Sequence, residues 1–203
     1  MRSVLVASLF TTLVTAAAIP EPRALATPVQ GWNETQTTLI HPNGDTSLCL
    51  EAVDKVAAAA VVVAKCDCTK LQGWKAEKFG DNGVRFVLDP TIIEGNAAPT
   101  IKQQQCIDLG GVSTTMNSPG YHPYNGRPAV LHPCRQGSHN WPDNQNRYGT
   151  DFVADNSRFF VTYNNTGVQQ EFCLDRDASN PTNVQALECN DSTNQLWTIG
   201  ASF

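Results

Sequence analysis

Short segments in which apolar and polar residues alternate occur along most of the chain. The segment from Asn183 to Leu187 alternates in steps of two, which is the period of a strand with one buried face. The segments from Thr37 to His41 and from Val84 to Leu88 are rich in β-branched and apolar residues, and a proline soon follows each. The run from Ala57 to Ala60 could begin a helix, but three valines follow it directly and β-branched residues favour strands. The pattern predicts an all-β chain of short strands joined by loops.

One arrangement of strands and cysteines occurs three times. Its clearest copy runs from Phe172 to Trp197 and holds two predicted strands, two cysteines and a closing Gln-x-Trp motif. A weaker copy ends at Trp74, and another carries an insertion from Val112 to Arg127 and lacks the closing tryptophan. Twelve strands in three such copies can close on themselves and so remove exposed sheet edges, which predicts a pseudo-threefold barrel with a hairpin cap. We place the first, second and third copies at about residues 37–83, 84–156 and 157–203.

The first residues have the features of a secretory signal peptide, which we assign to residues 1–18. A positive Arg2 precedes an apolar run from Val4 to Val14, and small residues follow. A membrane anchor is the alternative, but the run is shorter than the ~20 apolar residues that a span needs. Residues 19–36 are then a lead-in. About 175 residues remain from Val29 onward, which suits one domain. We expect a secreted, extracellular protein without membrane insertion.

Seven cysteines in an exported chain predict disulfides rather than metal ligands. Cys66 precedes Trp74 by eight residues, as Cys189 precedes Trp197, so Cys66 is favoured over Cys68 as the partner of the first half-cystine. Cys68 then has no partner. A zinc site at Cys66-x-Cys68 is the alternative, but no second ligand pair follows at finger spacing. The spacing thus predicts one disulfide in each copy: Cys49–Cys66, Cys106–Cys134 and Cys173–Cys189.

Charge and motifs exclude several classes of function. The net charge of −5 and the lack of a Lys/Arg cluster argue against a nucleic-acid partner. There is no Gly-x-Ser-x-Gly, no His-Glu-x-x-His and no cofactor loop. The sequence therefore predicts no enzyme, no cofactor and no metal. The sequons at Asn33, Asn164 and Asn190 predict N-glycosylation, although Asn and Thr are common enough here for chance matches.

Cys-Leu-Asp at 173–175, a second strand ending in cysteine, and Asn-Gln-Leu-Trp at 194–197, with weaker copies before them, resemble the ricin B-type lectin family. The resemblance covers Thr37 to Phe203. It implies a β-trefoil that binds glycans or glycoproteins, of galactose or N-acetylgalactosamine type. In that family each copy can hold a shallow sugar site. Its parts are the Asp of Cys-x-Asp, an aromatic residue two positions before the second cysteine, and the Asn that precedes Gln-x-Trp.

These residue types suit a sugar. A carboxylate accepts hydrogen bonds from two neighbouring hydroxyls, an amide donates and accepts, and a ring packs on the apolar face of a pyranose. The first copy departs from the pattern at all three positions, with Glu51, Ala64 and Leu71, and we expect no binding there.

The second and third copies keep parts of the pattern. Carried over position by position, the resemblance implies sugar-binding roles for Asp108, His132, Asn144 and Gln145 in the second copy, and for Asp175, Asn194 and Gln195 in the third. The second is the preferred site, because Leu187 stands at the ring position of the third. The insertion of the second copy carries Tyr121, His122 and Tyr124, which could add aromatic contacts or obstruct.

Several alternatives stay open. The aspartates could merely accept hydrogen bonds from hairpin backbone, and for both Gln-x-Trp motifs a structural role is favoured. A β-trefoil also serves as a scaffold for secreted protease inhibitors that act through a protruding loop, for which the insertion or the segment from Thr91 to Thr100 are candidates. A degenerate trefoil that binds nothing is a further possibility. The identity of the sugar and the oligomeric state are left open.

Overall fold

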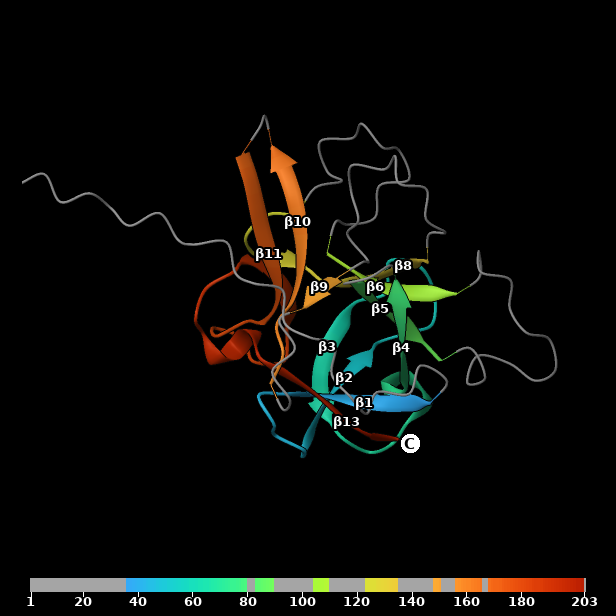
Figure 1. The fold of residues 1–203 in the computed structure, drawn as a ribbon. Coiled ribbons are helices and arrows are strands. Elements are labelled where there is room, and N and C mark those ends of the chain that lie inside the picture. Colours follow the sequence, from blue (N-terminus) through green and yellow to red (C-terminus); the bar gives the residue numbers. More distant parts are fainter. Residues whose placement is uncertain are drawn as a thin grey trace, which may run out of the picture.

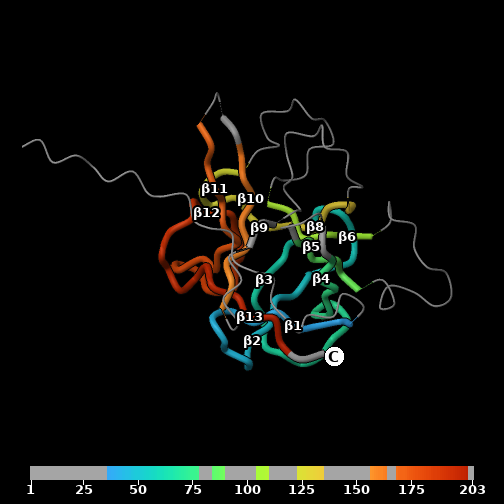
Figure 2. The backbone as a smooth tube through the Cα atoms, in the orientation of Figure 1, coloured from blue at the N-terminus to red at the C-terminus, as the bar shows by residue number. Residues whose placement is uncertain are grey.

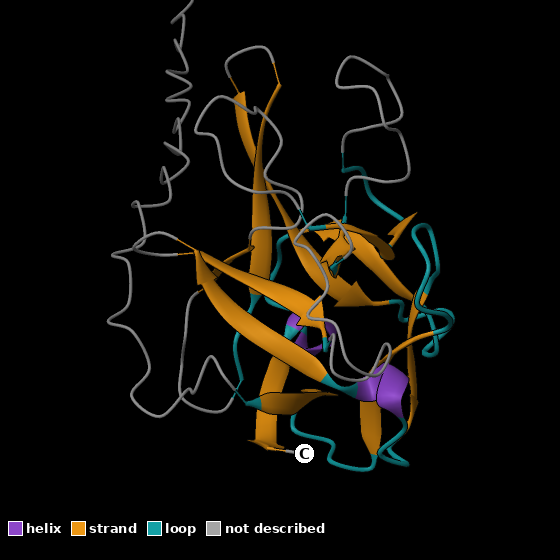
Figure 3. Ribbon diagram, turned by 90° about the vertical axis from the view of Figure 1, so that its right-hand side faces the viewer, coloured by secondary structure: helices purple, strands orange, loops and turns teal. Residues whose placement is uncertain are grey.

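The computed structural model describes residues 36–79, 83–89, 104–109, 123–134, 148–150, 156–165 and 168–202. These ranges are β-strands and loops with two short 3-10 turns (Figure 3). No helix within them is long and apolar enough to cross a membrane. The predicted signal peptide, the lead-in, Asn33, Asn144 and Gln145 lie outside the described residues.

The elements follow one another as four strands per copy with one extra short strand, β7. They are β1 (Thr37–Pro42), β2 (Leu48–Ala52), β3 (Val61–Lys65), η1 (Lys70–Gln72), β4 (Trp74–Phe79), β5 (Gly83–Leu88), β6 (Gln105–Asp108), β7 (Arg127–Pro128), β8 (Val130–Pro133), β9 (Tyr148–Thr150), β10 (Phe159–Asn165), β11 (Val168–Arg176), β12 (Val184–Glu188), η3 (Thr193–Gln195) and β13 (Trp197–Ser202). The strands predicted at 37–41, 84–88 and 183–187 are present, with ends shifted by at most one residue. The run from Ala57 to Ala60 is turn and bridge, not helix.

Six of the described strands form a closed ring. They are hydrogen-bonded in the order β13-β1-β4-β5-β9-β10. A bridge between Ser157, just ahead of β10, and Trp197, the first residue of β13, joins the two ends. The N–H of Ser157 donates to the carbonyl of Trp197 at 2.8 Å, and the reverse bond is 2.9 Å. Closure leaves no free edge in this ring, which is how small β-barrels avoid edge-to-edge association.

Three hairpins complete the fold: β2–β3, β6–β8 and β11–β12. Backbone hydrogen bonds join them to one another. The N–H of Val61 donates to Ala129 at 2.9 Å, that of Ala129 to Val184 at 2.9 Å, and that of Val63 to Thr182 at 2.8 Å. One hairpin from each copy therefore meets the other two.

The two tryptophans that close the Gln-x-Trp motifs lie in the core, in equivalent places. Trp74 and Trp197 are fully buried. The indole N–H of Trp74 donates to the carbonyl of Leu50 at 2.9 Å, and that of Trp197 to the carbonyl of Leu174 at 2.8 Å. Each tryptophan thus satisfies its only polar atom while it fills the core. The other largest fully buried side chains are Phe86, Phe159, Ile40, Leu50, Leu88, Ile107, Leu109 and Leu131.

All three predicted disulfides are present: Cys49–Cys66, Cys106–Cys134 and Cys173–Cys189. Cys68 is free and exposed, as predicted. Each disulfide joins the two strands of one hairpin close to its open end. It lies on the same face of the hairpin as the predicted site residues.

The hairpin of β10 and β11 contains β11, which with nine residues is the longest of the described strands. Its pairing runs from Phe160 with Cys173 to Asn165 with Val168, and its far end projects beyond the ring (Figure 1). The predicted glycosylation residue Asn164 lies in the projecting part.

Candidate functional site

The glutamine of the third Gln-x-Trp motif braces the main chain. Gln195 is fully buried at the end of η3. Its Oε1 accepts from the N–H of Asn190 at 2.8 Å, and its Nε2 donates to the carbonyl of Glu188 at 3.2 Å. These two residues flank Cys189, so the amide holds the chain on both sides of the disulfide. The turn is capped by the hydroxyl of Ser192, which accepts from the N–H of Asn194 at 3.2 Å.

Gln72 does the same in the first copy. Its Oε1 accepts from the N–H of Asp67 at 3.1 Å and its Nε2 donates to the carbonyl of Lys65 at 2.8 Å, on either side of Cys66. The same Nε2 also donates to Oε2 of Glu51 at 2.6 Å. The glutamine of this motif therefore links the strand end to the acidic residue of Cys-x-Asp/Glu. This geometry favours the structural role for Gln72 and Gln195 and makes each the support of the neighbouring carboxylate.

Asp175 lies on the face that the third-copy site requires. In the pairing of β11 with β12, Cys173 is opposite Leu187 and Asp175 is opposite Gln185. Residues opposite one another share a face, so these four side chains lie on one side of the hairpin. The intervening Leu174 is fully buried on the core side. Figure 2 shows β11 and β12 side by side, next to β10.

The carboxylate of Asp175 is buried and held by amides. Only 2% of this residue is exposed, and its Oδ1 accepts from Nε2 of Gln185 at 3.0 Å. Burial raises the pKa of Asp175 above its ordinary value of 3.8, and the negative charge of Asp177 adds to the rise. Hydrogen bonds from Gln185 and Gln195 act in the other direction, because they stabilise the ionised form.

Gln185 is a further residue of this face that was not predicted from the sequence, although a signal for it exists. Gln185 precedes Leu187 by two residues on a strand of period two, so it points to the same face as the ring position. Gln185, Leu187 and the predicted Asn194 are all half-buried. The third copy thus brings together a buried carboxylate, a partly exposed amide, an apolar side chain and the asparagine of the motif.

The second copy places two of its four predicted residues together. In β6 and β8, Cys106 is opposite His132 and Asp108 is opposite Val130, so Asp108 and His132 share the face of the disulfide. His132 therefore does not point into the core. Both are nonetheless buried, with 1% of Asp108 and 7% of His132 exposed. Asn144, the third residue of the expected concavity, lies outside the described residues, so the second-copy site stays a prediction.

The first copy carries no sugar pattern, as expected. Glu51 lies opposite Val62, and Cys49 lies opposite Ala64. The carboxylate of Glu51 accepts a hydrogen bond from Gln72. Val62 and Ala64 stand at the positions equivalent to Gln185 and Leu187.

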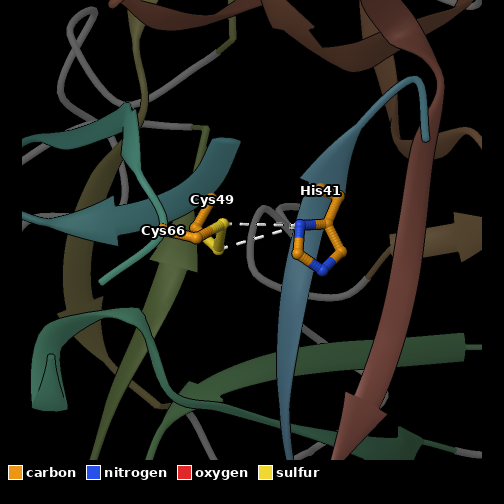
Figure 4. A group of neighbouring side chains, drawn as sticks. All are labelled: His41, Cys49 and Cys66. Carbon is orange, nitrogen blue, oxygen red and sulfur yellow. Dashed lines mark hydrogen bonds between the residues drawn. A yellow bond between two sulfur atoms is a disulfide. The ribbon is translucent and has the colours of Figure 1, made fainter. Parts of the chain in front are cut away.

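A histidine packs against the first disulfide (Figure 4). Nδ1 of His41 is 2.8 Å from the carbonyl of Leu48 and 3.7 and 3.6 Å from the sulfurs of Cys49 and Cys66. Metal binding requires thiolates, and these sulfurs are joined to each other, so the group is a packing contact in this oxidised state. A Cβ at residue 200 would lie 2.6 Å from Nε2 of His41. The imidazole ring therefore fits in this place because residue 200 is a glycine.

No protein-family model and no curated protein matches the sequence. Solved structures do match. The designed 3-fold symmetric protein ThreeFoil has a TM-score of 0.55 at 13% identity, over 81% of this chain and 98% of that chain. A lectin of Polyporus squamosus, bound to the human-type influenza-binding epitope Neu5Aca2-6Galb1-4GlcNAc, has a TM-score of 0.50 at 14% identity. An exo-beta-1,3-galactanase of Clostridium thermocellum has a TM-score of 0.54 at 12% identity.

These similarities show the fold. The chain is all-β and shares the fold of threefold-symmetric trefoil proteins, which confirms the predicted architecture at that level. The match to the lectin includes 85% of this chain but only 50% of the lectin chain. The match to the galactanase includes only 30% of the galactanase chain. With no matching family model, the ricin B-type assignment stays a resemblance.

Proposed function

We propose that this protein is a secreted lectin that binds glycans of galactose or N-acetylgalactosamine type, without catalysis, through its third copy. The observation that carries the proposal is Asp175, a buried carboxylate that accepts a hydrogen bond from Nε2 of Gln185 at 3.0 Å and whose ionised form is also stabilised by the amide of Gln195. A carboxylate fixed in this way accepts hydrogen bonds from neighbouring sugar hydroxyls. The half-buried Asn194 lies at the position that the resemblance assigns to the second polar contact.

The burial of Asp175 supports a role beyond structure. A neutral asparagine at this position would still offer an oxygen to Gln185 and would avoid burying a charge. The cost of burying that charge is what raises the pKa of Asp175. Retaining an acid where a neutral residue would be more stable is typical of binding and catalytic sites. The charge offers the stronger acceptor, which is what a polyhydroxyl ligand uses.

The structure moves our preference from the second copy to the third. Asp108 and Asp175 are equally buried, with 1% and 2% exposed, but the neighbours differ: His132 is buried beside Asp108, whereas Gln185, Leu187 and Asn194 are half-buried. We keep the second copy as a weaker candidate.

Secretion is part of the proposal and is supported by the chemistry of the cysteines. Three disulfides persist in oxidising compartments and are rare in the cytosol. The lectin neighbour with a bound glycan epitope supports glycans as ligands. For the inhibitor alternative, the segment from Thr91 to Thr100 and most of the second-copy insertion lie outside the described residues.

A glycan array followed by calorimetric titration with lactose tests the proposal. We expect wild type to bind, and Asp175→Asn to lose at least tenfold in affinity, because its neutral oxygen is a weaker acceptor. Asp54→Asn is the matched control, since Asp54 is exposed in the β2–β3 hairpin, and it should bind as wild type does. Absence of any bound glycan contradicts the lectin proposal, and unchanged binding by Asp175→Asn contradicts the site. Asp108→Asn run in parallel tests the second copy.

A further inference from the structure

The short strand β7 belongs to the second copy but pairs with the hairpin of the third. Pro128 in β7 lies opposite Gln185 in β12. The turn just ahead of β7 is docked on the same strand, where the side chain of Asn125 accepts from the N–H of Glu188 at 2.7 Å. A segment of the second copy is therefore fixed along the edge of β12 that faces away from β11.

The register places Pro128 on the face of the proposed site. Gln185 lies opposite Pro128 on one side and opposite Asp175 on the other. Because residues opposite one another share a face, these three residues form a row across β7, β12 and β11. Arg127 is paired with the fully buried Ala186 and so lies on the core side. Neighbouring strands are about 4.8 Å apart, so Pro128 and Asp175 end the row about 10 Å from each other.

The row is open at the end that the second copy forms. Pro128 is exposed, and Gln185 and Leu187 are half-buried. A Cβ on Gly126 would lie 3.9 Å from Oε1 of Gln185, and apart from its chain neighbours no other atom of the described residues would lie within 4 Å of it. Gly126 therefore leaves room beside Gln185 that a side chain would fill.

Pro128 supplies an apolar surface where the third copy lacks a ring. Leu187 stands at the ring position, two residues beyond Gln185 on the same face, which makes it the diagonal neighbour of Pro128 at about 7–8 Å. Two apolar side chains and the carboxylate of Asp175 thus border the half-buried amide of Gln185. A galactose-type pyranose has the matching division, since its hydroxyls lie along one edge and C–H groups cover one face. Apolar walls with a few fixed polar groups are typical of sites for such ligands.

We propose that Pro128 is the apolar wall of the third-copy site, so that two copies build this one site. The assignment rests on the proposed glycan-binding function. The ligand class is a galactose-type pyranoside whose hydroxyls bond to Asp175 and whose C–H face packs against Pro128 and Leu187. A proline ring loses almost no side-chain entropy when a ligand packs on it. A proline at a sheet edge also prevents further strand pairing, and binding measurements separate the two roles.

An intermolecular nuclear Overhauser effect tests the contact directly in the folded wild-type protein. With isotope-labelled proline in the chain and unlabelled lactose, we expect cross-peaks between proline ring protons and the C–H protons of galactose. Pro128→Ala should remove these cross-peaks, which assigns them to residue 128. Cross-peaks that persist in Pro128→Ala, or their absence from lactose-bound wild type, overturn the assignment.

Calorimetric titration with lactose measures the contribution of the wall. Pro128→Ala should bind about threefold to fivefold more weakly than wild type, because part of the apolar surface is lost. Pro181→Ala is the matched control, since Pro181 is exposed in the loop of the same hairpin and lies outside the row, and it should bind as wild type does. Thermal unfolding of Pro128→Ala should match wild type, and if that variant does not fold, the measurement on wild type still decides.

Failure of this assignment can be told apart from failure of the proposed function. If Asp175→Asn loses binding but Pro128→Ala binds as wild type does, Pro128 is not the wall and the glycan site stands. Equal losses in Pro128→Ala and Pro181→Ala also overturn the assignment, because the effect then comes from removing a proline rather than from its place. If wild type binds no glycan at all, the proposed function fails, and this assignment with it.

Discussion

Gln72 and Gln195 are equivalent residues in two copies, and substitutions at them can separate an effect on stability from an effect on binding. Replacing either by alanine removes an amide that braces the chain around a disulfide. For Gln72 three hydrogen bonds are lost, at 3.1, 2.8 and 2.6 Å, the last to a carboxylate. For Gln195 two bonds to backbone are lost, at 2.8 and 3.2 Å, together with the stabilisation that its amide gives to the ionised form of Asp175.

The expected loss of stability is similar for the two variants. A neutral hydrogen bond contributes about 1 kcal/mol net and one to a charged group about 1.5–3 kcal/mol, so each alanine variant should lose about 3–5 kcal/mol. For a domain of this size about 1 kcal/mol lowers Tm by about 2–4 °C. Both variants should therefore melt about 6–20 °C below wild type.

Binding should respond in one variant only. Gln195→Ala releases Asp175 from one of its two amides, so the carboxylate loses its fixed orientation and lactose affinity should fall. Gln72→Ala acts on Glu51 in the copy without a sugar pattern, and affinity should stay as in wild type. Calorimetric titration below both melting points, with unfolding followed by circular dichroism, measures the two effects separately. Equal loss of affinity in both variants, or equal retention, would refute the assignment of the site to the third copy.

Three further results are expected. Asp175→Asn should be more stable than wild type near neutral pH. Burial raises the pKa of Asp175 in the folded state above 3.8, so the wild type loses stability as pH rises through that folded pKa. Urea unfolding at several pH values should show the stabilities of the two proteins converging in acid. Gly200→Ala should cost about 1–3 kcal/mol, because the new Cβ would lie 2.6 Å from the ring of His41; a melt equal to wild type contradicts this. Thiol titration under native conditions should find one reactive group in wild type and none in Cys68→Ser, with the same unfolding curve, since Cys68 is exposed and outside the disulfides.

Features that depend on short-range sequence patterns were predictable from the sequence. Alternation located β12, equal spacing from cysteine to tryptophan distinguished Cys66 from Cys68, and Gln-x-Trp identified the core tryptophans. Each depends on residues close together in the chain. Strand period and half-cystine spacing are set by backbone geometry, so they leave a direct trace in the sequence.

Contacts between distant segments left no such trace. The docking of Asn125 on Glu188 joins residues 63 apart, and nothing near either residue indicates the other. The burial of Asp108 and His132 likewise depends on what packs over β6 and β8, not on the alternation within those strands. Sequence therefore assigned the candidate residues to a copy and a strand face, while their burial and their neighbours from other copies required the structure.

The closed ring has a consequence for how the chain folds. Closure pairs β1 with β13, and Thr38 contacts Ser202 across 164 residues, whereas the disulfides link residues 17, 28 and 16 apart. Loop-closure entropy opposes such distant contacts, and chains dominated by them fold in milliseconds to seconds. The disulfides can stabilise each hairpin early, and each bypasses the residues that it encloses, but most of the path between Thr38 and Ser202 lies outside the three disulfide loops. We expect the pairing of β1 with β13 to form late, so a Thr38 substitution should speed unfolding more than it slows folding.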